Sequence, residues 1–269
     1  MKFDFDELSI NYLDNNMVFN ADEKDVNIIP RSYINSILDK IVENEYSAIE
    51  VKKIETELKK ILDYTFICND KLTELDLNEV ESLGIGAFEC CANLTEIKNN
   101  KNKLKIDLGT FSNCTRLEKI PMIYNAPRRS FYNCTSLKNV ILIGGDSIES
   151  EAFYGCTSLS NIMTSSSIKY IGTYAFYNDI SLRHIDLGNH LEIIDAHAFE
   201  HCNIHSITIP RTVKYVETKA FAHNIGLTDI IFEHLQGDSI YFNDDVFFGC
   251  PNIKIINKNN NEHIKRHFK

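Results

Sequence analysis

Apolar and polar positions along the chain follow a regular repeat in which each unit is anchored by a phenylalanine. A small residue often precedes this Phe, a Cys often stands three residues after it, and the pattern Leu-x-x-Ile-x-apolar follows. A unit this short cannot bury its own apolar side, so it must be covered by the next unit, which predicts a repeat architecture. Successive anchors lie 20 to 26 residues apart, at Phe66, Phe88, Phe111, Phe131, Phe153, Phe176, Phe199, Phe221 and Phe247.

The Leu-x-x-Ile-x-apolar segment alternates between apolar and polar positions at its end, which predicts one short β-strand in each unit. Strands of successive units would pair in parallel, about 4.8 Å apart. A further apolar pair leads to the next Phe, as Ile168 and Ile171 do before Phe176. We therefore expect a solenoid with a continuous apolar interior and with outward columns formed by the intervening residues.

The pattern (I/L)xxIxxxAFxxCxxLxxIxI, present nearly whole from Ile168 to Leu187, resembles the BspA-type leucine-rich repeats that are also known from treponemal surface proteins. The resemblance covers residues 64–257. It implies a curved leucine-rich-repeat array with a parallel β-sheet on its concave face. It also implies a non-enzymatic binding protein, since members are mostly of that kind, and many of them are exported adhesins.

Further segments flank the repeats. Residues 32–63 are predicted to form a helical hairpin, because "SAIE" (Ser47 to Glu50) fits a capping box and the apolar residues behind it keep helical spacing. We interpret the hairpin as a cap over the end of the apolar interior; the alternative is a separate helical module that binds a partner. Residues 1–31 would be an acidic extension, and 258–269 a basic C-terminal cap or tail. The expected fold class is an α+β repeat solenoid with an N-terminal helical cap.

Composition and charge narrow the class of partner. The net charge of −10 disfavours nucleic acid, because an acidic chain repels phosphate backbones. The N-terminus has no secretory signal and no run of about 18 apolar residues occurs, so we expect no membrane partner and a cytoplasmic location. The eight cysteines then indicate free thiols in a reducing compartment. The alternative is a surface or exported protein that uses a route not visible in the sequence.

The recurring cysteines are interpreted as a buried column. Catalysis would need one Cys singled out beside a base, whereas the same context recurs in unit after unit. A zinc site would need clustered ligands such as CxxC pairs, and none is present. Disulfides between units are geometrically allowed, but the column also contains Asp179 and Asn224, which cannot bridge. We predict no catalytic residue, no cofactor and no metal.

The histidines supply the alternative to that prediction. His201 lies two residues after its Phe anchor and His223 two residues after the next, so the repeat makes them neighbours on adjacent units. With Glu200 they would form a metal site, and a metal-dependent enzyme at this edge is the remote alternative function. The favoured interpretation is a solvated, His-rich convex edge. Neither a Gly-rich phosphate loop nor a GxSxG elbow is present.

The outward columns are the candidate surface for a protein partner, whose identity the sequence does not reveal. "VILIGG" places two Ile outward beside a Met of the next unit, and an exposed apolar cluster with a polar surround is typical of contact sites. The alternative is a slip in register that buries these residues. We predict a non-enzymatic protein-interaction scaffold, with an exported or surface adhesin as the alternative. The predicted binding residues are Ile141, Ile143, Met163, Tyr124, Arg128, Arg129, His184 and Asp186.

Overall fold

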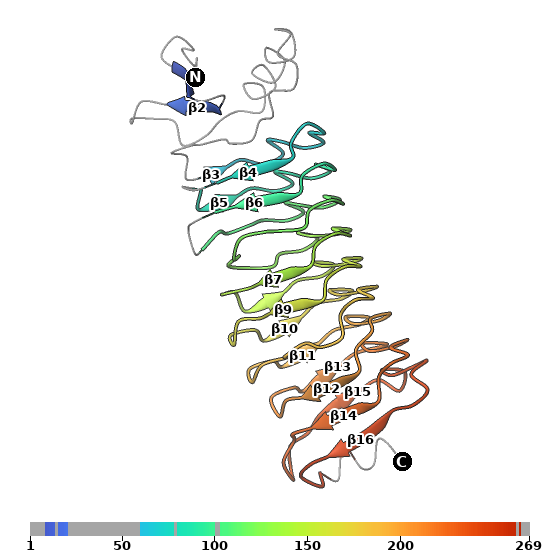
Figure 1. Cartoon of the computed structure of the whole chain (residues 1–269). Coiled ribbons are helices and arrows are strands. Elements are labelled where there is room, and N and C mark those ends of the chain that lie inside the picture. Colours follow the sequence, from blue (N-terminus) through green and yellow to red (C-terminus); the bar gives the residue numbers. More distant parts are fainter. Residues whose placement is uncertain are drawn as a thin grey trace.

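The computed structural model describes residues 9–13, 16–20, 60–77, 80–99, 103–261 and 264. The described residues between 60 and 261 form a parallel β-solenoid, whose repeat units, called rungs below, stack in chain order (Figure 1). The rungs contribute short strands to two ladders. Near the N-terminus, β1 (Ser9–Leu13) and β2 (Asn16–Asn20) form a separate antiparallel pair.

The first ladder consists of the predicted Leu-x-x-Ile-x-apolar strands. They pair in parallel and in the register of the repeat, with Leu75 opposite Ile97 and Val140 opposite Ile162. These central residues are buried and their neighbours face outward, because side chains alternate along a strand. The ladder divides into the sheets β4–β6, β7–β9 and β12–β14–β16. Its strands are β4 (Glu74–Asp76), β6 (Glu96–Lys98), β7 (Asn139–Ile141), β9 (Asn161–Met163), β12 (Ser206–Ile209), β14 (Asp229–Phe232) and β16 (Lys254–Asn257).

A second ladder forms from the apolar pair before each Phe, which the sequence pattern did not assign to a strand. Ile148, Ile171 and Ile194 are its buried inward residues, and they pair in parallel register. Five of its strands make one continuous sheet in the order β15-β13-β11-β10-β8. Its strands are β3 (Lys60–Ile61), β5 (Ser82–Leu83), β8 (Ser147–Ile148), β10 (Tyr170–Ile171), β11 (Ile193–Ile194), β13 (Tyr215–Val216) and β15 (Tyr241–Phe242).

The Phe anchors lie on tight turns. In most rungs the residues two before and two after the Phe have positive φ, as Tyr174 (57°) and Asn178 (64°) do around Phe176. Left-handed residues four positions apart interrupt the hydrogen-bond ladder that an α-helix requires. Apart from the single helical residue Ile264, all elements of the described residues are strands, so the predicted α+β class is wrong and this part of the chain is a parallel β-solenoid.

The predicted helical cap at residues 32–63 is not supported either. Residues 32–59 lie outside the described residues, and Lys60–Ile61, which the prediction placed in the second helix, form β3. The apolar residue Ile61 follows helical spacing but belongs to the repeat, because it pairs with Leu83 and is buried in the core. At the other end, Ile264 of the predicted C-terminal cap or tail is buried in the same core.

The Phe anchors form a stack through the interior. Centroids of successive rings from Phe66 to Phe247 lie 5.0 to 5.7 Å apart, and the rings are within 19° of parallel. A ring such as that of Phe153 is fully buried between its two neighbours. Since aromatic rings contribute more buried area than other core residues, this stack is the main apolar contact between rungs.

The buried Cys column lies beside the Phe stack, which confirms the core interpretation of these residues. The thiol of Cys156 donates a hydrogen bond to the carbonyl of Phe131 in the preceding rung, Sγ to O 3.1 Å, and other rungs repeat this contact. All the cysteines are free thiols. Burial raises the pKa of the Cys91 thiol to about 12, so this thiol stays protonated at neutral pH and acts as a donor, not a nucleophile.

Candidate functional site

The outward side of the first ladder carries an exposed apolar cluster. Ile141 in β7 lies opposite Met163 in β9, and the two residues are 40% and 65% exposed. Ile143 and Tyr124 are each 37% exposed. These four residues are called the apolar patch below. Because they are exposed, the alternative in which a register slip buries them is wrong.

Tyr124 is the member of the apolar patch that comes from the rung before β7. Ile123 forms a parallel bridge to Leu142 of the next rung, which brings the Tyr124 ring over Gly144. A Cβ at position 144 would lie 2.3 Å from this ring, so only glycine permits the contact. The ammonium of Lys105 lies 5.5 Å from the ring centroid on the preceding rung, a distance typical of a cation–π contact.

Polar groups surround the apolar patch. Asn161 Nδ2 donates a hydrogen bond to Asn139 Oδ1 at 2.9 Å, two residues before Met163 and Ile141 on their strands. His184 and Asp186 are exposed on the rung after β9, where Thr164 Oγ1 donates to the carbonyl of Asp186 at 3.1 Å. An apolar centre with a polar rim is the usual anatomy of a protein interface.

Arg128 and Arg129, also predicted as binding residues, lie at the turn before Phe131 instead of on the strand face. Both pair with Glu151 of the next rung, at 3.2 Å from Arg128 Nη2 and 3.1 Å from Arg129 Nε. The Arg129 guanidinium also lies 4.5 Å from the Tyr132 ring centroid. The predicted binding residues therefore lie in two separate places, the strand face and the turn edge. The two arginines already contact Glu151 and Tyr132 of this chain.

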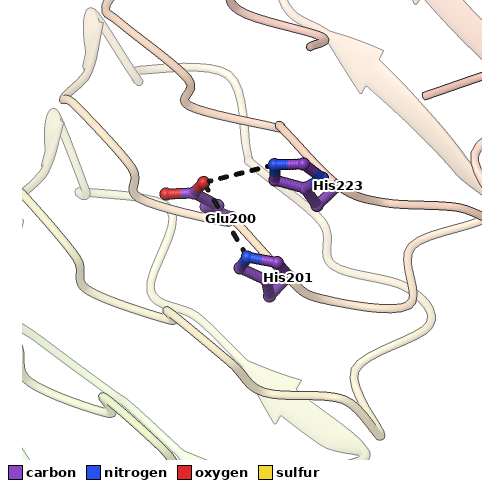
Figure 2. Close-up of side chains that lie close together, drawn as sticks. All are labelled: Glu200, His201 and His223. Atoms are coloured by element: carbon purple, nitrogen blue, oxygen red, sulfur yellow. Dashed lines mark ion pairs between the residues drawn. The ribbon is translucent and has the colours of Figure 1, made fainter. Parts of the chain in front are cut away.

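A second cluster lies on the turn edge, where Glu200, His201 and His223 come together (Figure 2). Glu200 Oε1 is 3.9 Å from Nε2 of His201 and 3.9 Å from Nε2 of His223. The two imidazoles are stacked, with centroids 4.5 Å apart and planes 6° from parallel. This confirms that the two histidines are neighbours on adjacent rungs.

The turn geometry of the repeat positions this cluster. His201 and His223 both occupy the left-handed position two residues after a Phe anchor, with φ of 59° and 56°. Glu200 is the residue directly after its anchor, a position that Tyr154 and Tyr177 fill in earlier rungs with rings stacked 4.9 Å apart. A carboxylate thus replaces a ring in an aromatic column, and it is buried there at 7% exposure.

Comparison with known families assigns the repeat. The family model for the BspA type leucine rich repeat region matches in six copies, over residues 10–118, 35–145 and 146–268. The chain belongs to the BspA-type leucine-rich repeat family. Family membership establishes this protein as a leucine-rich repeat protein of the BspA type, which is consistent with a role in protein interaction or surface adhesion.

Solved structures similar to this BspA-type protein are also leucine-rich repeat proteins. A leucine rich cell surface protein from Faecalibacterium prausnitzii is 19% identical, with a TM-score of 0.48 over 96% of this chain and 76% of that chain. A leucine-rich repeat protein from Eubacterium ventriosum is 20% identical, with a TM-score of 0.40 over 58% of this chain and 39% of that chain. The T. pallidum leucine rich repeat protein is 15% identical, with a TM-score of 0.41 over 94% and 91% of the two chains.

A search of curated proteins found no match to the BspA-type chain. Across the described ranges of the protein, no helix has the length and apolar character that crossing a membrane requires.

The sequence of this BspA-type protein did not place His197 in the cluster with Glu200. His197 Nδ1 lies 2.5 Å from Glu200 Oε2, and the His197 ring stacks on Tyr174 with centroids 4.5 Å apart. The register of the repeat carried the signal, because His197 stands two residues before its Phe anchor, as Tyr174 does in the preceding rung. The remaining members of the His-rich stretch, such as His205, lie outside the cluster.

Proposed function

We propose that this BspA-type repeat protein is a non-enzymatic binding protein that docks a protein partner on the apolar patch. The observation that carries the proposal is the Ile141–Met163 pair, two apolar side chains exposed side by side on adjacent strands. The inward side chains of a solenoid are buried between the stacked rungs, so a partner can only be recognised by the outward side chains. Apolar area at an interface contributes about 25 cal/mol per Å² removed from water.

The same face at the N-terminal end of the array exposes charged side chains in place of apolar ones. There the outward residues form a charge network in which Lys98 lies 3.6 Å from Glu74 and 3.5 Å from Glu96, and Lys119 lies 3.6 Å from Glu96. Exposed ion pairs of this kind are well solvated and contribute little to binding. The contrast within one ladder supports the apolar patch as the centre of the interface.

The chemistry of the patch defines the partner. We expect a protein segment that places an apolar side chain between Ile141 and Met163 and offers hydrogen-bonding groups to Asn139 and Asn161. Arg128 and Arg129 contribute little to this contact, since Glu151 and Tyr132 already hold them. The partner therefore needs no acidic motif.

The experiment is a comparison of two double variants. Ile141→Asp with Met163→Asp should abolish capture of the partner from native cells, and with purified partner should weaken binding at least about 30-fold, the loss of a hot spot. The matched control is Thr208→Asp with Ile231→Asp, which changes the same outward column where β12 faces β14. Both variants should retain the wild-type melting temperature within a few degrees.

Retention of the partner by the Ile141→Asp, Met163→Asp variant, or its loss from the control as well, would overturn the proposal. Fractionation of the native cells then separates the two roles open to such a surface. A cytosolic pool matches an interaction module, whereas an exclusively surface-bound pool matches an adhesin.

A further inference from the structure

We propose that Glu200, His201 and His223 form a binding site for a divalent transition-metal ion of the zinc class, through Glu200 Oε1 and the two histidine Nε2 atoms. These three donor atoms all lie within 4.8 Å of one another. Imidazole nitrogen and carboxylate oxygen are the ligands that zinc takes in proteins, and two His with one Glu is an established ligand set. Figure 2 shows the carboxylate facing both rings.

The distances lie within reach of coordination. Zinc bonds of about 2.0–2.2 Å place tetrahedral ligand atoms about 3.4 Å apart, and Glu200 Oε1 is 3.9 Å from each Nε2. Each contact must therefore close by about half an ångström, and the stacked rings must rotate so that their nitrogens converge. Rotation about the terminal torsion of His meets only a low barrier, since this torsion is broad.

The backbone around the cluster is already fixed. His201 N donates to Ala222 O at 3.0 Å, and His223 N donates to Phe248 O at 2.7 Å, so both turns are tied to the next rung. The two anchors beneath them, Phe199 and Phe221, stack with centroids 5.1 Å apart. Metal binding would thus need side-chain movement alone, which keeps the entropy cost of assembling the site low.

The buried carboxylate of Glu200 favours binding of a cation. Its carboxylate is buried, and its ion-pair partners in the part of the chain that the structure describes are all histidines, namely His197, His201 and His223. A buried carboxylate is costly unless a positive charge compensates it. A divalent ion bound to Oε1 would supply that charge.

His197 acts as a positioning residue for the carboxylate. Its Nδ1 lies 2.5 Å from Glu200 Oε2, on the opposite oxygen from the one that faces the other two histidines. Stacking on Tyr174 holds the ring in place. Such outer partners orient metal ligands, and their loss typically weakens metal binding about 10–100-fold.

The far side of the site is shaped by the last complete turn of the array. Phe248 packs its ring edge-on against His223, with centroids 5.4 Å apart. A Cβ at Gly249 would lie 2.5 Å from Nδ1 of His223, so this glycine leaves the room that the imidazole occupies. Three protein ligands leave a tetrahedral ion one open position, which suits water or a donor from a bound partner.

A competing metal site must be removed before the test. Cys68 and Cys90 occupy the same position on adjacent rungs, two residues after their Phe anchors, and Cys68 is exposed. Zinc and cobalt bind thiols well. The measurements therefore use the full chain with Cys68→Ser and Cys90→Ser as the parent.

The experiment titrates this parent with cobalt(II) alone and then displaces the cobalt with zinc. We expect one equivalent to bind, with visible absorption of a nitrogen- and oxygen-ligated ion and without a sulfur charge-transfer band. His201→Asn and His223→Asn should weaken binding by more than the about 10–100-fold expected for His197→Asn. Asparagine is the matched substitution, because Asn133 and Asn178 occupy the same left-handed position in other rungs.

The control is His205→Ala, an exposed histidine outside the cluster, which should bind cobalt as the parent does. Zinc should raise the melting temperature of the parent and of His205→Ala, but not of His201→Asn or His223→Asn. Equal cobalt affinity in parent, His201→Asn and His223→Asn would overturn the proposal. So would parent binding that His205→Ala weakens equally.

Discussion

Two buried columns run side by side through the solenoid, and they tolerate change differently. The column of Phe anchors is unbroken from Phe66 to Phe247, whereas the Cys column also contains Asp179 and Asn224. The Phe position is defined by shape, since each ring packs face to face with the next. The Cys position is defined by a hydrogen bond, since Cys and Asn both reach the preceding Phe carbonyl. Shape is therefore the stricter requirement of this fold.

The largest effect is expected from the Phe column. Phe153→Ala should lower the free energy of unfolding by about 3–5 kcal/mol, because it removes a fully buried ring and leaves a cavity in the stack. Urea unfolding measures the loss. Phe247→Ala, at the last anchor and only partly buried, is the control and should cost less. A cost below about 1 kcal/mol at Phe153 would show that shape is not the stricter requirement.

Asp179 is the position of the Cys column whose side chain lacks hydrogen-bond partners among the described residues. Its carboxyl group is fully buried, and neither oxygen has a hydrogen-bond partner in the described part of the chain. Burial raises its pKa well above the ordinary value, so the group is protonated in the fold at pH values where the unfolded chain is ionised. Stability contributed by the protonated form is therefore lost as the pH rises from about 3.9 toward the folded pKa.

An intermediate effect of opposite sign is expected from Asp179→Asn. Asn224 shows that an amide fits the column, with Nδ2 donating to Phe199 O at 2.7 Å and Oδ1 accepting from Ile204 N at 3.0 Å. The variant should gain about 1–3 kcal/mol near neutral pH, the cost of an unsatisfied buried polar group. It should also flatten the fall in stability above about pH 4.

Thermal melts over a pH series measure both effects. The reciprocal variant Asn224→Asp should introduce the pH dependence that Asp179→Asn removes. The same pH profile for Asp179→Asn and wild type would refute the assignment of a protonated, poorly satisfied carboxyl group.

The smallest effect is expected from Cys156→Ser. A hydroxyl still donates to the Phe131 carbonyl, so the loss should be about 1–2 kcal/mol, as for an ordinary buried substitution. Cys156→Ala is the sharper comparison, because it removes the side-chain donor and leaves that carbonyl with only the backbone donor Cys134 N. If Ser is the more costly of the two in urea unfolding, the hydrogen bond does not define the Cys position.

Most of the fold could be predicted from the spacing of the repeat. The period of the Phe anchors predicted the parallel pairing of Ile141 with Met163 and the contact between His201 and His223, because equal positions on adjacent rungs must be neighbours. Spacing could not predict the turns. Left-handed φ is expected of Gly or Asn, yet Tyr174 and Lys219 also adopt it, and only the packed array imposes that conformation.

The errors about the candidate sites arose where neighbours in sequence were taken as neighbours in space. Arg128 and Arg129 follow Tyr124 closely, but the chain passes from the strand face to the turn edge between them. Ile61 fitted a helical pattern because a two-residue strand is too short to show the alternation of apolar and polar residues that distinguishes a strand from a helix.

The two ladders also differ in continuity, and this has a mechanical consequence. The second ladder runs unbroken from β8 to β15, whereas the first is interrupted between β9 and β12. Around His184–Leu187, the rungs are therefore joined by the second ladder and by the backbone hydrogen bonds between turns, such as Phe176 N to Ala198 O, without a strand of the first ladder. This interruption lies between the rungs of the apolar patch and those of the Glu200 cluster, so bending there would change the spacing between the two surfaces while leaving each of them intact.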